Sequence, residues 1–200
     1  MVQAQETVRT KGMFPAYTGR LLSWSFIVAI IPPAVLAIAL YSKSLLLLQY
    51  THVITGGTWT GFDLFMGVIM SMVFRSLEPP ARVEVAKRLT PLNFFVMPSL
   101  AAVAITAGVY LAQDLGTFNL SSPWIIAAGV VVVILTVQGF GVFLPNSLRI
   151  FIEVSKPNPD TQKIIKLNMR NIRLAGSQAA FQLAIIFIMA HIAVYPGVTI

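Results

Sequence analysis

The sequence contains no cysteine. This absence excludes disulfides, thiolate metal sites, cysteine nucleophiles and iron–sulfur clusters with cysteine ligands. Charged residues are also scarce: they make up 10% of the 200 residues, against about a quarter in soluble domains. With 56% hydrophobic residues, the chain has more apolar surface than it can bury within itself. We therefore expect the surplus to face lipid.

The motifs of soluble enzymes are absent as well. The sequence has no phosphate-binding loop, no H-E-x-x-H motif and no arguable Ser/His/Asp set. These absences argue against soluble-type hydrolase chemistry. They assign no catalytic residue and do not decide whether the protein is an enzyme. The net charge of +7 would also suit nucleic acid, but basic residues collect on the cytoplasmic side of membrane proteins. The predicted partner is therefore the lipid bilayer and not nucleic acid.

The apolar residues form five long segments. Each reaches roughly the 20 residues that are needed to cross a hydrocarbon core of about 30 Å. The predicted fold is all-α: a polytopic helical bundle with five transmembrane helices, forming a single integral membrane domain over residues 1–200. The spans are predicted at about residues 21–41, 45–74, 92–112, 124–150 and 174–194. The basic, amphipathic stretch around residues 164–169 predicts an interfacial helix that leads into the fifth span.

The distribution of Lys and Arg predicts the orientation. Thirteen of the 14 basic residues lie in the N-terminal arm, between the second and third spans, or between the fourth and fifth spans. With five spans these regions share one side of the membrane, and only Lys43 lies on the other side. The positive-inside rule then places the N-terminus in the cytoplasm and the C-terminus outside.

Two histidines are candidate cofactor ligands. His52 lies near the predicted outer end of the second span, and His191 lies near the outer end of the fifth. At 1.5 Å per residue, both fall about 7–12 Å below the outer surface. Two imidazoles at matched depth on different helices can ligate one metal or the two faces of one haem. Gly56 and Trp59 share a helical stripe with His52 and are therefore candidate site-lining residues.

Each of these residues also has a simpler interpretation. A histidine near a membrane interface is often a hydrogen-bonding group, and glycines in a span most often form helix-packing contacts. Gly57 and Gly61 form a G-x-x-x-G pair of that kind beside the His52 stripe. Trp59 is either a cofactor contact or a packing residue.

Asp63 is the only acidic residue well inside a predicted span. We expect it to be buried in the bundle, either protonated or hydrogen-bonded. It lies about 16 Å further along the helix than His52, which is too far for the two to share a ligand.

Other polar residues are predicted at the middle or inner depth of the membrane. They are Gln138, Gln178 and Gln182, together with Asn93 and Asn146. Such a cluster indicates a proton path or a quinone-type pocket. The alternative is a set of interhelical hydrogen bonds, worth about 0.6 kcal/mol each in membranes.

The segment H-x3-G-G-x-W-x-G, which begins at His52, is followed by a basic loop and then by LTPLNFFVMPSLAAVAITAGVYL. This arrangement resembles the copper-resistance-D-type and related small membrane proteins, which include the J-type haem-binding protoporphyrinogen oxidases. The resemblance covers residues 45–111 and extends loosely to the basic approach into the last span. It implies a haem- or copper-associated bundle with His52 as a ligand and with Trp59 and the glycines lining the site. The chain departs from the oxidase pattern because it has no basic residue inside a later span and has an extra first helix.

These observations predict a protein that binds haem b, or alternatively copper, through His52 and His191 near the outer leaflet. Its expected role is electron transfer or membrane oxidoreductase chemistry, with a quinone or a redox protein as partner. One alternative is a non-catalytic accessory subunit of a larger membrane complex or a homo-oligomer. A second alternative is a transporter of a metal or another small solute. The expected location is the plasma membrane of a prokaryote.

Overall fold

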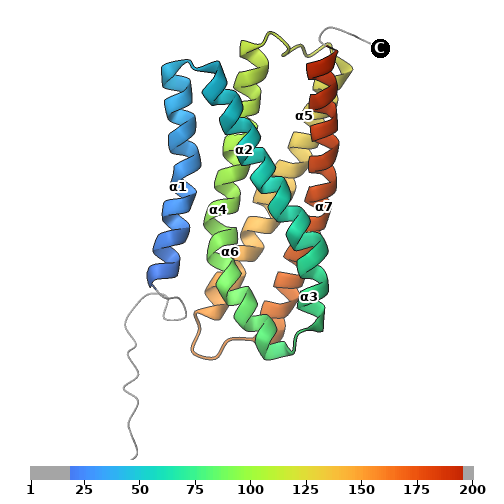
Figure 1. Cartoon of the computed structure of the whole chain (residues 1–200). Coiled ribbons are helices and arrows are strands. Elements are labelled where there is room, and N and C mark those ends of the chain that lie inside the picture. Colours follow the sequence, from blue (N-terminus) through green and yellow to red (C-terminus); the bar gives the residue numbers. More distant parts are fainter. Residues whose placement is uncertain (1–18, 196–200) are drawn as a thin grey trace, which may run out of the picture.

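A computed structural model describes residues 19–195, and these residues form five long helical rods (Figure 1). The first rod is α1 (Gly19–Ser42) and the third is α4 (Pro79–Asp114). The second rod joins α2 (Leu45–Leu64), the π-helical segment η1 (Phe65–Met70) and α3 (Ser71–Ser76). The fourth joins α5 (Pro123–Thr136), the π-helical segment η2 (Val137–Phe143) and α6 (Leu144–Val154), and the fifth is α7 (Thr161–Val194).

All five rods are long and apolar enough to cross a membrane. The described residues form no strand. The predicted all-α, five-span, multi-pass membrane bundle is therefore confirmed. At 1.5 Å per residue the 36 residues of α4 extend about 54 Å, which is more than a hydrocarbon core of about 30 Å, so its ends project or the helix tilts.

Two rods begin well before the apolar segments from which their spans were predicted. α4 begins at Pro79 rather than near residue 92, because proline is favoured in the first turn of a helix, where its missing N–H is not needed. α7 begins at Thr161, directly after Asp160, whose side chain accepts a hydrogen bond from the Lys163 backbone N–H at 3.0 Å. The interfacial helix predicted near residues 164–169 is therefore the first part of one continuous α7.

α4 lies at the centre of the bundle. It packs against α1, α2, α6 and α7, whereas α1 contacts only α4 and α2 extensively. In Figure 1, α2 crosses the bundle diagonally from the α1 side to the α7 side. Because of this crossing, the first half of α2 lies against α4, and its continuation, η1, lies against α7.

The two ends of the bundle differ in charge. The α3–α4 and α6–α7 turns lie together at one end (Figure 1), which we call the basic end. Here the buried Glu153 carboxylate accepts hydrogen bonds from Lys156 Nζ at 2.9 Å and Lys163 Nζ at 2.6 Å, which fixes the α6–α7 turn. Arg9 and Lys11, on which the predicted sidedness also depends, lie outside the described residues.

The second and fifth rods touch backbone to backbone at two glycines. A Cβ atom added to Gly67, in η1, would lie 2.4 Å from the Gly176 Cα atom of α7. A Cβ atom added to Gly176 would meet Gly67 at 3.6 Å, which is ordinary van der Waals contact. Only Gly67 therefore has no room for a side chain at this crossing.

This asymmetry predicts different effects for two alanine substitutions. Gly67→Ala forces the rods apart, and overpacking of this kind costs about 1–3 kcal/mol. Gly176→Ala, on the facing helix, needs no displacement and is expected to leave stability unchanged or slightly raised, because alanine favours helix over glycine. Thermal unfolding of the detergent-purified variants, followed by tryptophan fluorescence, measures the difference. Equal melting temperatures would contradict the backbone contact.

Candidate functional site

His52 is held against α4 by a hydrogen bond to the backbone. Its Nδ1 atom lies 2.8 Å from the Ala104 carbonyl oxygen. A carbonyl oxygen can only accept, so Nδ1 carries the proton and donates it. The lone pair is then on Nε2, for which residues 19–195 supply no hydrogen-bond partner.

The close packing of α2 on α4 at this level requires small residues. A Cβ atom added to Gly108 would lie 2.7 Å from Cε1 of the His52 ring. A Cβ atom added to Gly56, one turn after His52, would meet the Ala104 Cβ atom at 3.9 Å. Gly108 thus lets the imidazole ring lie directly against the α4 backbone, whereas a methyl group at Gly56 would make an ordinary van der Waals contact.

His191 occupies a different set of contacts, near the end of α7. Its ring stacks on Trp124 at the start of α5, with 3.8 Å between ring centroids and 26° between ring planes. Tyr195 lies on another side, with 5.1 Å between centroids. The Nε2 atom of His191 is buried and has no hydrogen-bond partner among the described residues. Trp124 therefore orients this imidazole.

Both histidines lie toward the end of the bundle formed by the α1–α2 turn and the α4–α5 loop, which we call the histidine end (Figure 1). His52 contacts α4 and His191 contacts α5, and no direct contact between the two is recorded within residues 19–195. The same residues contain no group of three or more His, Cys, Asp or Glu side chains that could hold a metal. A ligand shared by His52 and His191 stays a prediction.

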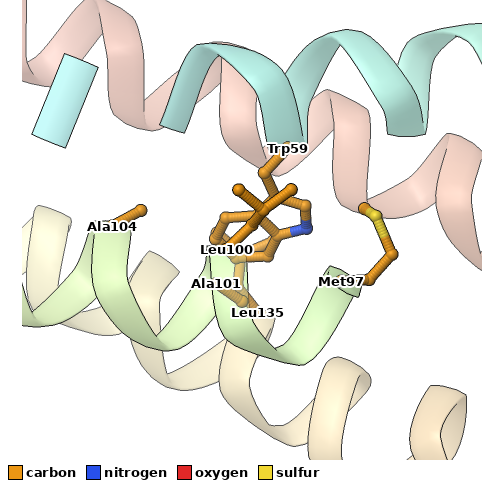
Figure 2. Close-up of a cluster of buried hydrophobic side chains, with 6 residues drawn as sticks. All are labelled: Trp59, Met97, Leu100, Ala101, Ala104 and Leu135. Atoms are coloured by element: carbon orange, nitrogen blue, oxygen red, sulfur yellow. The ribbon is translucent and has the colours of Figure 1, made fainter. Parts of the chain in front are cut away.

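Trp59 belongs to an apolar cluster between the histidine end and the deeper polar residues. Its side chain is only 6% exposed. Figure 2 shows its indole ring among side chains of α4 and α5; the cluster comprises Trp59, Met97, Leu100, Ala101, Ala104 and Leu135. Trp59 is therefore a packing residue of this apolar cluster. It also lines the cavity beside Asp63 that is described below.

Asp63 lies one turn beyond Trp59 and is 0% exposed. Gln182 of α7 donates a hydrogen bond from Nε2 to Asp63 Oδ2 at 2.9 Å. The indole N–H of Trp59 also interacts with the Asp63 carboxyl group. The expectation of a buried, hydrogen-bonded Asp63 agrees with these contacts.

Gln178 of α7 connects Asp63 to backbone groups of the fourth rod. In one orientation its amide nitrogen donates to Asp63 Oδ2 at 3.1 Å and its oxygen accepts from the Gly139 backbone N–H at 3.2 Å. In the reverse orientation its nitrogen reaches only the Leu135 carbonyl oxygen, at 3.4 Å. The first orientation satisfies more groups and is the one we assign. Because η2 is π-helical, Gly139 N–H and Leu135 C=O are both accessible to this side chain.

A small cavity adjoins the Asp63 carboxyl group. Its volume is about 30 Å³. Its lining includes Trp59, Asp63, Asn93, Met97, Gly139 and Gln178. Four of the five rods therefore contribute residues to this one cavity. The spacing of residues within a single span does not predict that Met97 and Gly139 belong to it.

The predicted inner polar cluster is divided in the structure. Asn93 lines the Asp63 cavity, and Gln138 Nε2 donates to Ser177 Oγ at 3.2 Å beside it. Asn146 instead donates to Asn171 Oδ1 at 3.1 Å, between α6 and α7. Asn171 was not among the predicted residues, because its position on a basic, amphipathic stretch gave no sign that its side chain is buried and paired.

Comparisons with protein-family models, with curated proteins and with solved structures give no match. The resemblance to copper-resistance-D-type proteins therefore stays a prediction.

The His52 hydrogen bond predicts one imidazole tautomer. The chain has two histidines, so His191→Gln leaves His52 as the only imidazole. Nitrogen-15 NMR of this variant, labelled at histidine and held in lipid, is expected to show His52 with a proton on Nδ1. An Nδ1 atom without a proton would mean that the bond to Ala104 is not formed.

Proposed function

We propose that this chain is a membrane protein that binds haem b through His52 and His191 and acts in electron transfer or as a membrane oxidoreductase. The observation that carries the proposal is the hydrogen bond from His52 Nδ1 to the Ala104 carbonyl oxygen. A histidine ligand commonly donates its other ring N–H to a carbonyl or carboxylate, which fixes the tautomer and the ring orientation. His52 has this arrangement.

The donor set favours haem over copper. Haem iron needs only one or two axial ligands from the protein, because the macrocycle supplies the others. At the histidine end, two imidazole Nε2 atoms make no hydrogen bond within residues 19–195. A copper site built from several side chains finds less support, since residues 19–195 group no three His, Cys, Asp or Glu residues. Haem b bound here would carry one electron at a time.

The chain's own residues would orient this group and limit the access of water to it. Ala104 and Gly108 fix the His52 ring, and Trp124 fixes the His191 ring. The Trp59 cluster separates the histidine end from the polar interior. We place the protein in a prokaryotic plasma membrane with the histidine end outside, where a membrane quinone or a redox protein would exchange electrons with it.

An accessory subunit of a larger membrane complex is the second candidate. Cβ atoms added to Gly57 and Gly61 would meet nothing within 4 Å, so the G-x-x-x-G pair does not pack within the described residues. Such a pair commonly receives another transmembrane helix. Recovery of a stoichiometric partner chain after mild solubilisation of native membranes would favour this function.

A metal or small-solute transporter is supported less. Transport requires a polar route across the bilayer, but the Trp59 cluster is apolar and lies between the histidines and Asp63. Uptake into vesicles that contain the protein tests this alternative.

Absorption spectra of the detergent-purified protein test the haem proposal. We expect a Soret band and sharp visible bands after dithionite reduction, with about one haem per chain by pigment analysis of the same sample. Both His52→Ala and His191→Ala should abolish this low-spin spectrum, because each removes a residue that would hold the haem iron. A colourless protein that stays colourless after incubation with haem would refute the proposal, and stoichiometric copper would change the cofactor.

A glycine pair separates the ligand role of His52 from general damage to the fold. Gly108→Ala displaces the His52 ring, because the new Cβ atom would lie 2.7 Å from Cε1. Gly129→Ala on α5 is the control, since a Cβ atom there meets nothing within 4 Å. We expect a changed or weakened haem spectrum only in Gly108→Ala, with both variants equally monodisperse on size exclusion. Identical spectra for the two would contradict His52 ligation.

A further inference from the structure

Several buried oxygen atoms around Asp63 lack a hydrogen-bond partner. Among residues 19–195 they include Asp63 Oδ1, Gln182 Oε1 and Asn93 Oδ1. Asp63 and Asn93 line the Asp63 cavity, and Gln182 is hydrogen-bonded to Asp63. Carboxylate and amide oxygens only accept hydrogen bonds or coordinate cations. Their arrangement therefore calls for a ligand that donates hydrogen bonds or carries positive charge.

The Asp63 carboxyl group has no positive charge beside it within the described residues. The side chains and backbone that face it come from Gln178 and Gln182 of α7, Asn93 of α4, Gly139 and Phe143 of η2, and Trp59 of α2. None of these groups titrates. The ion pairs recorded within residues 19–195 involve Glu84 and Glu153 and leave Asp63 without one. An isolated carboxylate inside a membrane is strongly disfavoured, so its charge must be neutralised by something other than a side chain.

The size of the cavity limits what that ligand can be. A volume of about 30 Å³ accommodates one or two water molecules, since one water needs about 10–15 Å³ of cavity volume. A quinone ring or another organic molecule does not fit without movement of the helices. A proton, or a sodium ion with a water molecule, does fit.

We propose that Asp63 is a reversible binding site for a small monovalent cation, H⁺ or Na⁺, in the middle of the bundle. Gln182 and Gln178 hold Asp63 Oδ2 by donating hydrogen bonds to it. Oδ1 of Asp63, Oδ1 of Asn93 and Oε1 of Gln182 make no hydrogen bond within the described residues, so they are the oxygens that would accept the cation. When the ligand is a proton, the O–H bond of the carboxylic acid breaks on release and a water molecule in the cavity takes the proton.

Infrared difference spectroscopy tests this site without reference to any cofactor. The chain has three aspartates, Asp63, Asp114 and Asp160. The double variant Asp114→Asn and Asp160→Asn changes two exposed positions and leaves Asp63 as the only aspartate. Asparagine also serves as a helix cap at position 160. This variant, labelled with carbon-13 at the aspartate carboxyl carbon and held in lipid nanodiscs, gives an isotope-shifted band that belongs to Asp63 alone.

The protonated C=O band of Asp63 is then followed as pH is raised, first in a sodium-free buffer with a bulky organic cation and then with NaCl added at fixed pH. Loss of the band with pH alone, unchanged by sodium, identifies a proton site. Loss of the band on addition of sodium identifies a site where Na⁺ displaces H⁺. Both outcomes support the proposal.

A band that is unaffected by pH and by sodium would overturn the proposal, because Asp63 would then be a permanently neutral structural group. Absence of the band under every condition would overturn it as well. Asn93→Ala serves as an independent variant, since it removes a cavity oxygen that makes no hydrogen bond within the described residues. It is expected to shift the pH or the sodium concentration at which half of the band is lost, and an unchanged midpoint would exclude Asn93 from the site. None of these readouts depends on haem, so the outcome is independent of the proposed electron-transfer function.

Discussion

The backbone contact between Gly67 and Gly176 determines how the polar interior is assembled. A single added methyl group at Gly67 would lie 2.4 Å from the facing Cα atom, so the two rods are as close as their backbones allow. Asp63 lies one helical turn from this contact, and Gln182 lies on the facing helix. Their hydrogen bond of 2.9 Å depends on that separation, because amide and carboxylate groups interact directly only over a narrow range of distance.

The central helix α4 connects two polar levels that the packing keeps separate. At one level its backbone accepts the His52 hydrogen bond through Ala104. At the other level it supplies Asn93 to the Asp63 cavity. The Trp59 cluster fills the space between these levels with apolar side chains. The proposed haem site at the histidine end and the proposed cation site at Asp63 therefore share no residue as a ligand.

The π-helical segments explain why polar groups lie where a regular helix would offer none. η2 leaves the Gly139 N–H and the Leu135 carbonyl oxygen within reach of the Gln178 amide, which links the fourth rod to Asp63. η1 follows Asp63 directly and contains Gly67. π-Bulges of this kind are frequent at functional sites. Here they supply hydrogen-bonding groups to a membrane interior that has no bulk water to satisfy them.

The sequence by itself determined the number and type of the helices, because five apolar segments of membrane-spanning length have no other stable form in lipid. It also singled out His52, His191 and Asp63, because ionisable groups inside a span are costly and therefore stand out. Only the tertiary structure decided their partners: Ala104 for His52, Trp124 for His191, and Gln182 for Asp63. Helical periodicity specifies the face of one helix, whereas the crossing of two helices depends on packing between residues far apart in the chain.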